Sequence, residues 1–182
     1  MELFINLLFS GLTRGSIYAL LALGYTMVYG IIQLINFAHG EIYMIGAFTA
    51  LIMTSVFTIL GLPAAAVAAL ALLIAVVWSS MYGITLDKVA YKPVRNAPRL
   101  SALISAIGMS LFLQNYVRLA QTSDFLPFPR LIPTLHFLDS ISGLNSSQFV
   151  IFVTTSVVMV ILTILIKFTR IGKSMRAAAQ DR

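Results

Sequence analysis

The sequence contains no cysteine and few charged residues. None of its 182 residues is cysteine, so neither a disulfide framework nor a cysteine-ligated metal site can form within it. Charged residues make up 10% of the chain, whereas soluble domains carry roughly 25%. So few charges cannot cover a water-facing surface, and this excludes an ordinary soluble globular domain.

Common enzyme motifs are also missing. The chain has no GxxxxGKS/T phosphate loop, no HExxH zinc motif and no GxSxG nucleophile elbow. His39 and Glu41 are two positions apart, whereas two ligands on one helical face need a spacing of three or four. We therefore predict no catalytic residue and no metal site. The alternative is an enzyme that works inside a membrane through His39 and Glu41, and it needs a third converging group.

Long uncharged stretches stand where a soluble protein has charges. Residues 15–40 and 42–86 contain no Asp, Glu, Lys or Arg, and shorter uncharged stretches cover 100–117 and 140–166. About 20 apolar helical residues cross a bilayer core of ~30 Å, and lipid offers no partner for free backbone groups. The sequence predicts an all-α, polytopic transmembrane helical bundle. Its five spans are expected at about 15–35, 42–60, 63–86, 101–117 and 149–166.

The first 14 residues, MELFINLLFSGLTR, do not have the pattern of a signal peptide. They start with Glu2 rather than a basic segment and lack a small-residue cleavage site, so we expect a short amphipathic leading segment followed by a retained span. No charged residue lies well inside the expected spans, which argues against a proton- or sodium-driven carrier with its own charged relay. The small-residue spacings Gly11/Gly15 and Ser79/Gly83 predict close helix contacts.

Basic residues predict the orientation of the chain. Residues 87–99 hold four Lys or Arg and residues 167–182 hold five, whereas the long loop 118–148 holds two. Lys and Arg are enriched in cytoplasmic loops of membrane proteins. We therefore expect the two basic segments in the cytoplasm, and the long loop and the N-terminus outside.

The stretch NFAHGE places polar groups between the first two expected spans. Gly40 permits unusual backbone angles, and a helix that begins near residues 38–40 points free N–H groups toward a carboxylate. This favours a break lining a substrate pathway, where Glu41 meets a substrate ammonium. The alternatives are a tight cytoplasmic turn stabilised by Glu41, and a bond across helices from Gln33 or Asn36. The pathway candidates are Gln33, Asn36, Ala38, His39, Gly40 and Glu41.

The final stretch, TRIGKSMRAAAQDR, predicts a short amphipathic helix. Ile171, Met175 and Ala178 lie on one apolar stripe, and Gly172 lets the chain turn after the fifth span. Such a helix can dock into a groove of a partner; the alternative is a basic flank that only fixes orientation. The candidate coupling residues are Gly172, Met175, Arg176, Ala177, Ala178, Ala179 and Asp181.

Three stretches carry a resemblance to a known family. They are LLALGYTMVYGIIQLINFAHGEIYMIGAF, DKVAYKPVRNAPRLSALISAIGMSLFLQN and TRIGKSMRAAAQDR. They resemble branched-chain amino acid ABC transporter permeases of the LivH type, over essentially the whole chain, with NFAHG and RAAAQD as the more specific parts. Family members are longer and have more spans. We therefore interpret residues 1–182 as a single transmembrane permease domain, truncated at the cytoplasmic coupling segment.

The resemblance implies a permease of the bacterial inner membrane that is not itself an enzyme. It implies four kinds of partner: a second homologous permease, two cytoplasmic ATPase subunits, a periplasmic substrate-binding protein and membrane lipid, with no nucleic acid. ATP is used by the ATPase subunits, and no cofactor is expected on this chain. The substrates implied are leucine, isoleucine and valine. Urea or short amides are an alternative, because related permeases carry them, and a purely structural membrane subunit is another.

Overall fold

The structure is a computed structural model that describes most of the chain. The described residues are 2–32, 36–94, 97–122, 124, 126–129, 131 and 146–180. The chain divides into two compact units, Met1–Gln33 with Ile132–Arg182 and Leu34–Leu131. The regular structure of the described residues is helical, with no strand among them, which confirms the predicted all-α class. That the chain forms one permease domain stays a prediction.

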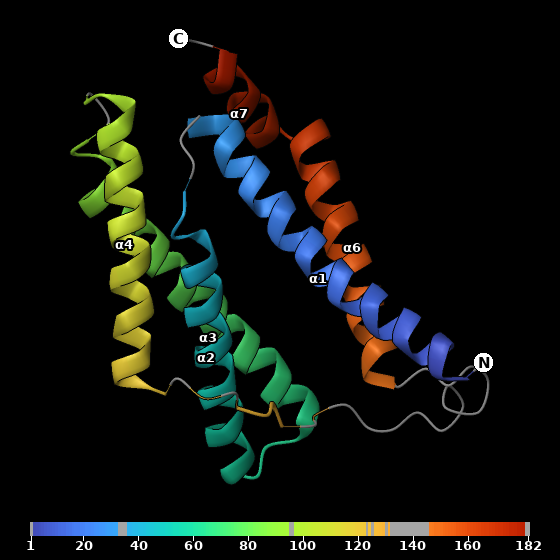
Figure 1. Ribbon diagram of the computed structural model, residues 1–182. Coiled ribbons are helices and arrows are strands. Elements are labelled where there is room, and N and C mark those ends of the chain that lie inside the picture. The colour runs from blue at the N-terminus through green and yellow to red at the C-terminus, as the bar shows by residue number, and fades with distance from the viewer. Residues whose placement is uncertain are drawn as a thin grey trace. The chain divides into compact units, whose positions relative to one another are not determined.

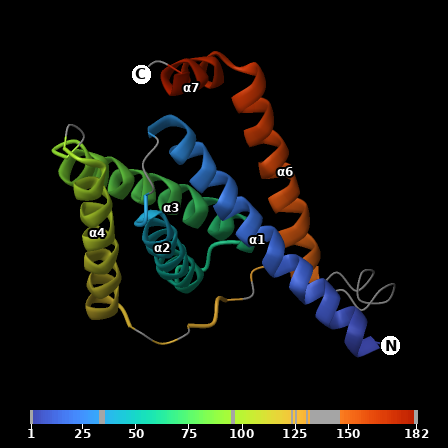
Figure 2. The same cartoon turned by 45° about the horizontal axis from the view of Figure 1, so that its top comes forward.

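The first unit contains three helices. They are α1 (Glu2–Ile32), α6 (Ser146–Phe168) and α7 (Arg170–Gln180). α1 and α6 lie side by side and run in the same direction (Figures 1 and 2). Gln148 Nε2 donates a hydrogen bond to Ser10 Oγ at 3.0 Å and so ties the first turn of α6 to α1. α7 contacts both of the longer helices.

α1 is continuous, so the expected division into a leading segment and a separate span is wrong. The helix begins at Glu2 and has 31 residues, which gives a length of roughly 46 Å. Its apolar window is Asn6–Gly30 rather than residues 15–35. The hydroxyl of Thr13 donates to the Phe9 carbonyl at 2.8 Å, so this polar side chain is satisfied inside the helix and does not interrupt it.

Arg14 lies inside this apolar window, so the expectation that no charged residue lies well inside a span is also wrong. It is exposed on α1, four residues after Ser10, which meets the start of α6. Arg14 is therefore about 6 Å further along the helix than that contact. A long arginine side chain at this depth can extend its charged end toward the membrane surface. The argument against a proton- or sodium-driven carrier, which relied on spans without charged residues, therefore does not hold.

The second unit is a helical hairpin with a third long helix beside it. Its elements are α2 (His39–Ile59), α3 (Ala64–Leu86), the π-helical turn η1 (Asp87–Tyr91) and α4 (Arg99–Ala120). Between α2 and α3, Gly61 has a φ of 74°, a value that favours glycine. Pro63 is the N-cap of α3, directly before the first helical residue Ala64.

Small residues bring α2 and α3 close together. A Cβ added to Gly46 would lie 2.6 Å from the Oγ of Ser79, and one added to Gly83 would lie 4.0 Å from the Cδ1 of Ile42. These contacts confirm the prediction from the Ser79/Gly83 spacing. The Gly11/Gly15 spacing makes no such close contact with the described residues, because a Cβ at either position meets no described atom within 4 Å.

The core of the second unit joins all of its helices. Its buried members come from the residues before α2 and from α2, α3, η1 and α4: Ala38, Ile45, Leu86, Ala90, Tyr91, Ala106, Leu113 and Val117. Among the described residues, five helices are long and apolar enough to cross a membrane, the number that the sequence predicts. The third of these windows, Ala64–Tyr91, is longer than expected because η1 continues the helix.

Candidate substrate pathway and coupling helix

Asn36 braces the bend that precedes α2. Its Oδ1 accepts hydrogen bonds from the Ala38 backbone N–H at 3.1 Å and from the Tyr91 hydroxyl at 2.5 Å, and its carbonyl accepts from the His39 N–H at 3.1 Å. Tyr91 is buried, 7% exposed, and lies at the end of η1. The side chain of Asn36 is therefore used in holding the bend against η1, as in the alternative that had this residue bond across helices.

The structure confirms the predicted start of α2 but not the predicted role of Gly40. The helix begins at His39, inside the predicted interval 38–40, and its N-cap Ala38 offers no side-chain hydrogen bond. Gly40 is helical, and a Cβ there would meet nothing within 4 Å. The expectation that Gly40 supplies an unusual backbone angle is therefore wrong. Gln33 lies outside the described residues.

A hydrogen bond from Ser110 to Glu41 joins this bend to the middle of α4. The Oε1 of Glu41 accepts a hydrogen bond from the Ser110 Oγ at 3.1 Å, and Ser110 is the midpoint of the apolar window Leu100–Ala120. Figure 1 shows α2 beginning part-way along α4 and running in the same direction. Ile52 and Gln121, each eleven residues further along, line one cavity. If α4 crosses the bilayer, the polar bend lies roughly 15 Å from either end of α4.

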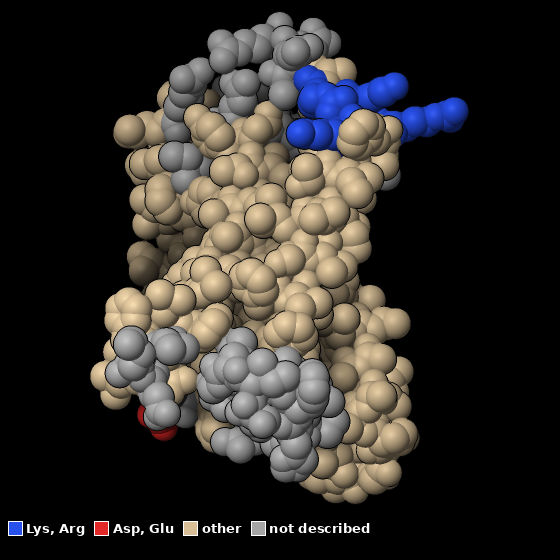
Figure 3. Space-filling model, turned by 90° about the vertical axis from the view of Figure 1, so that its right-hand side faces the viewer, with Lys and Arg blue, Asp and Glu red and all other residues tan. Residues whose placement is uncertain are grey.

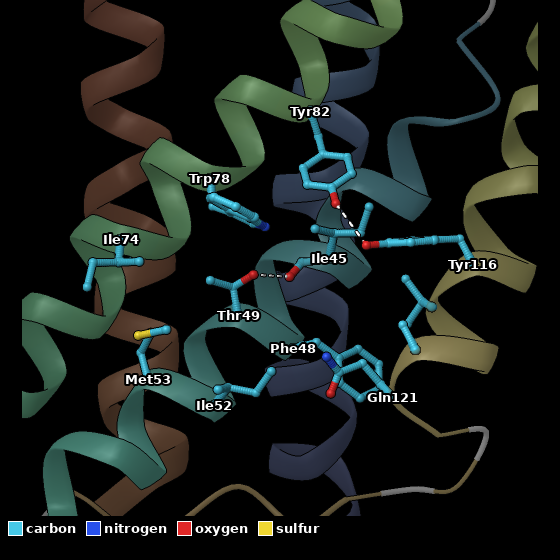
Figure 4. A pocket seen from close by; sticks show the side chains of 12 residues that line it. Ile45, Phe48, Thr49, Ile52, Met53, Ile74, Trp78, Tyr82, Tyr116 and Gln121 are labelled. Atoms are coloured by element: carbon cyan, nitrogen blue, oxygen red, sulfur yellow. Dashed lines mark hydrogen bonds between the residues drawn. The ribbon is translucent and has the colours of Figure 1, made fainter.

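An aromatic cavity lies between α2, α3 and α4 of the second unit. It has a volume of about 350 Å³, and Figure 4 shows Trp78, Tyr82 and Tyr116 around it. The Tyr82 hydroxyl donates to the Tyr116 hydroxyl at 3.5 Å, and the Thr49 hydroxyl is turned to the Ile45 carbonyl at 2.8 Å. The lining is Ile45, Phe48, Thr49, Ile52, Met53, Ile74, Trp78, Tyr82, Tyr116, Val117, Ala120 and Gln121. It contains no charged side chain, so it suits an apolar group.

α6 and α7 meet in a tight elbow at Thr169. A Cβ added to Gly172 would lie 2.0 Å from the Ile166 carbonyl oxygen, so the close approach of the backbone requires glycine there. The Gly172 N–H donates to the Thr169 Oγ1 at 3.2 Å. Arg176 Nη1 donates to the Ile166 carbonyl at 2.5 Å, and Nη2 to the Lys167 carbonyl at 3.4 Å. The guanidinium thus caps carbonyls that a helix end leaves without partners.

Basic side chains gather around this elbow. Figure 3 shows the blue Lys and Arg atoms at one end of the face it presents. The basic residues of α6 and α7 are Lys167, Arg170, Lys173 and Arg176. Met175 is half-buried and Ala177 is exposed, while the side chains of Ala178 and Ala179 and all of Asp181 lie outside the described residues. The predicted amphipathic helix is confirmed, and its docking role stays a prediction.

Sequence reasoning found the two bends and missed their distant partners. Within the described part of the chain, the structure joins Asn36 to Tyr91 and Glu41 to Ser110. Ser110 is one of three serines in an apolar helix and gives no sequence signal of its own. Tyr91 lies beyond the expected end of the third span. The sequence signal for its role as a partner is an aromatic ring within a basic segment.

These observations define a class of protein first. Five apolar helices, a polar bend level with the middle of a span and a basic surface helix describe a multi-pass membrane protein. In the portions of the chain that are described, no three His, Asp or Glu side chains converge as a metal site would require.

Comparison with known proteins gives the family. Residues 7–182 match the branched-chain amino acid transport system / permease component family, and the chain belongs to it. It is 44% identical over 183 residues to the high-affinity branched-chain amino acid transport system permease protein LivH of Escherichia coli (strain K12) and to that of Salmonella typhimurium, over 98% of this chain and 59% of each relative. It is 46% identical over 184 residues to BraD, the permease protein of the same description from Pseudomonas aeruginosa, over 98% of this chain and 60% of BraD.

The chain therefore spans about 59% of the length of the LivH relatives. No solved structure matches the chain.

Proposed function

We propose that this chain belongs to the permease subunit of an ATP-driven importer that moves leucine, isoleucine and valine across the bacterial inner membrane. The observation that carries the proposal is the identity of 44% to 46%, over 98% of the chain, to permeases named for high-affinity branched-chain amino acid transport. The five candidate spans support it.

The orientation proposed places the N-terminus in the periplasm and the elbow between α6 and α7 in the cytoplasm. The basic residues of 87–99 and 167–182 support it. The parallel course of α1 and α6 agrees with their being the first and fifth spans, which cross in the same direction. Single cysteines at positions 92 and 129 test it, since the chain has none of its own. In intact cells, an impermeant thiol reagent should label position 129 and spare position 92; the opposite pattern reverses the orientation.

The proposed route passes the bend at Asn36–Glu41. Asn36 and Ala38 hold the bend in place, while His39, Gly40 and Glu41 open the N-terminal end of α2 toward the route, with Gln33 just before it. Glu41 is the group that can meet a substrate ammonium. Glu41→Gln keeps an oxygen that accepts from Ser110 but removes the charge, so uptake should fall. Unchanged uptake assigns Glu41 only to the start of the helix.

The proposed partners supply energy and substrate. Two ATPase subunits bind and hydrolyse ATP, a second permease completes the membrane part, and a periplasmic binding protein delivers the amino acid. α7 is the proposed coupling element, through Gly172, Met175, Arg176, Ala177, Ala178, Ala179 and Asp181. The amphipathic pattern of α7 and its place at a basic elbow support this role. Ala178→Trp should lower leucine uptake for each ATP hydrolysed, and an unchanged ratio removes α7 from the contact.

The experiment that tests the proposed function is uptake of radiolabelled leucine by the full-length permease with its partner subunits and ATP. Isoleucine and valine in excess should suppress the uptake, and urea should leave it unchanged. Uptake that urea suppresses, or that does not need ATP, overturns the proposal.

A further inference from the structure

A second cavity opens between α2, the end of α4 and the chain that follows α4. Its volume is about 560 Å³, and all of its lining belongs to the second unit. The lining is Met44, Ala47, Phe48, Leu51, Gln114, Val117, Arg118, Thr122, Asp124, Leu126 and Phe128. Phe48 and Val117 also line the aromatic cavity, so the two cavities lie on either side of the contact between α2 and α4.

The lining of this second cavity combines both signs of charge with a mainly apolar wall. Arg118 comes from the last turn of α4, and Asp124 comes from the segment just after it. The Thr122 hydroxyl donates to Asp124 Oδ2 at 3.3 Å and accepts from the Asp124 N–H at 3.1 Å, which orients the carboxylate. The described residues contain no ion pair between Arg118 and Asp124. Both charges are therefore available to a ligand.

We propose that this cavity binds a zwitterionic α-amino acid with a branched apolar side chain. Arg118 takes the carboxylate, because a guanidinium presents paired donors to two oxygens. Asp124 takes the ammonium, and Leu51 and Leu126 contact the aliphatic side chain. In the proposed orientation the cavity is at the periplasmic end, where a delivered amino acid first meets the permease.

The pair of charges favours this ligand over a lipid. A phospholipid phosphate suits Arg118 alone, and the carboxylate of Asp124 repels it. A fatty tail suits the apolar wall and makes no use of either charge. An amino acid zwitterion satisfies both charges and the wall together. The inference rests on the proposed function for its source of ligand, and on the cavity for its site.

The direct test is photolabelling of the full-length transporter in proteoliposomes with photo-leucine, a diazirine analogue of leucine. Without ATP, we expect the label on peptides that contain Leu51 or Leu126. Excess leucine should suppress it, whereas 4-methylpentanoate, which lacks the ammonium, and isopentylamine, which lacks the carboxylate, should not. Labelling confined to other peptides, or suppressed equally by 4-methylpentanoate, overturns the proposal.

Variants of the two charges sharpen the test. Arg118→Gln and Asp124→Asn should each raise the photo-leucine concentration for half-maximal labelling by about tenfold, since a hydrogen bond to a charged group is lost. Arg118→Lys retains the charge and should preserve most of the labelling. Lys88→Gln and Asp87→Asn are matched controls, because they remove the same charges at the other end of the unit. Retention of the ATPase subunits on purification checks that each variant is folded.

The outcomes separate this site from the proposed function. If the wild-type transporter takes up leucine with ATP but neither charge variant weakens labelling, the site is wrong and the function stands. If Arg118→Gln weakens labelling and Asp124→Asn does not, the cavity binds an anion rather than a zwitterion, and the proposal falls. If the wild-type transporter takes up no leucine, the proposed function fails whatever the labelling shows.

Discussion

Two bends in this chain are held by different kinds of contact. At the bend before α2, Asn36 bonds to Tyr91 and Glu41 bonds to Ser110, across 55 and 69 residues of sequence. At the elbow after α6, the partners are local, and the guanidinium of Arg176 reaches back only ten residues. The first bend is positioned by other helices, whereas the second carries its own geometry.

This difference indicates how each bend responds to motion. A bend held by distant helices changes when those helices shift, because its hydrogen bonds are lost one at a time. A bend held locally keeps its angle and passes a displacement from one helix to the next as a rigid piece. The proposed substrate route needs the first property, and the proposed coupling helix needs the second. The following variants break one kind of contact at a time.

Gly172→Ala is expected to have the largest effect. The new Cβ would lie 2.0 Å from the Ile166 carbonyl oxygen, so the elbow must open. Such overpacking costs about 1–3 kcal/mol or more, and we expect leucine uptake by the full-length transporter to fall by about tenfold or more. Gly108→Ala in α4 is the matched control, because its Cβ meets nothing within 4 Å. Equal uptake by the two variants contradicts a sterically closed elbow.

Arg176→Ala should have the next largest effect. It removes the donors that cap the last carbonyls of α6, and because the side chain is exposed the loss is about 1 kcal/mol. We expect about fivefold less leucine imported for each ATP hydrolysed, with partial recovery in Arg176→Lys. Co-purification of the ATPase is measured in parallel. Loss of the ATPase at an unchanged ratio shows that Arg176 docks the partner instead of positioning α7.

Tyr91→Phe tests the distant brace of the first bend. It keeps the buried ring and removes the hydroxyl that bonds to Asn36, a loss of about 0.5–1.5 kcal/mol. In thermal unfolding of the purified permease, the effects of Tyr91→Phe and Asn36→Ala should not add, because they remove the same bond. Tyr18→Phe, at an exposed position of α1, is the control. Additive effects show that the two residues act separately.

Ser110→Ala should have the smallest effect. Hydrogen bonds between membrane helices average about 0.6 kcal/mol, and Glu41 keeps its place in the first turn of α2 without this donor. Leucine uptake should change by less than about threefold. A much larger loss shows that the depth of the bend depends on this one hydroxyl.

The sequence predicts the local features well because their causes are local. The number of spans, the start of α2 near residue 39 and the turn at Gly172 follow from apolar length and from single residues. The sequence does not predict the continuity of α1, because the uncharged run starts only after Arg14, although a long side chain can leave the membrane from within a helix. The charged cavity was missed because Arg118 and Asp124 converge with α2 only through tertiary contacts.

The π-helical turn η1 sets the orientation of the groups at its end. A π turn takes in one residue more than an α turn, as the bond from the Lys92 N–H to the Asp87 carbonyl at 2.8 Å shows. The additional residue rotates all that follows by about 100°, which brings the Tyr91 hydroxyl to Asn36 and the Ala90 carbonyl to the Ser105 hydroxyl. Deleting one residue from η1 gives a regular α turn and keeps the phase of the helix that follows, because the i→i+5 turn and the i→i+4 turn each complete about one revolution. The orientation of Ala90 and Tyr91 therefore depends on the wide turn itself, and closing it into a regular turn without a deletion would rotate both groups away from their partners.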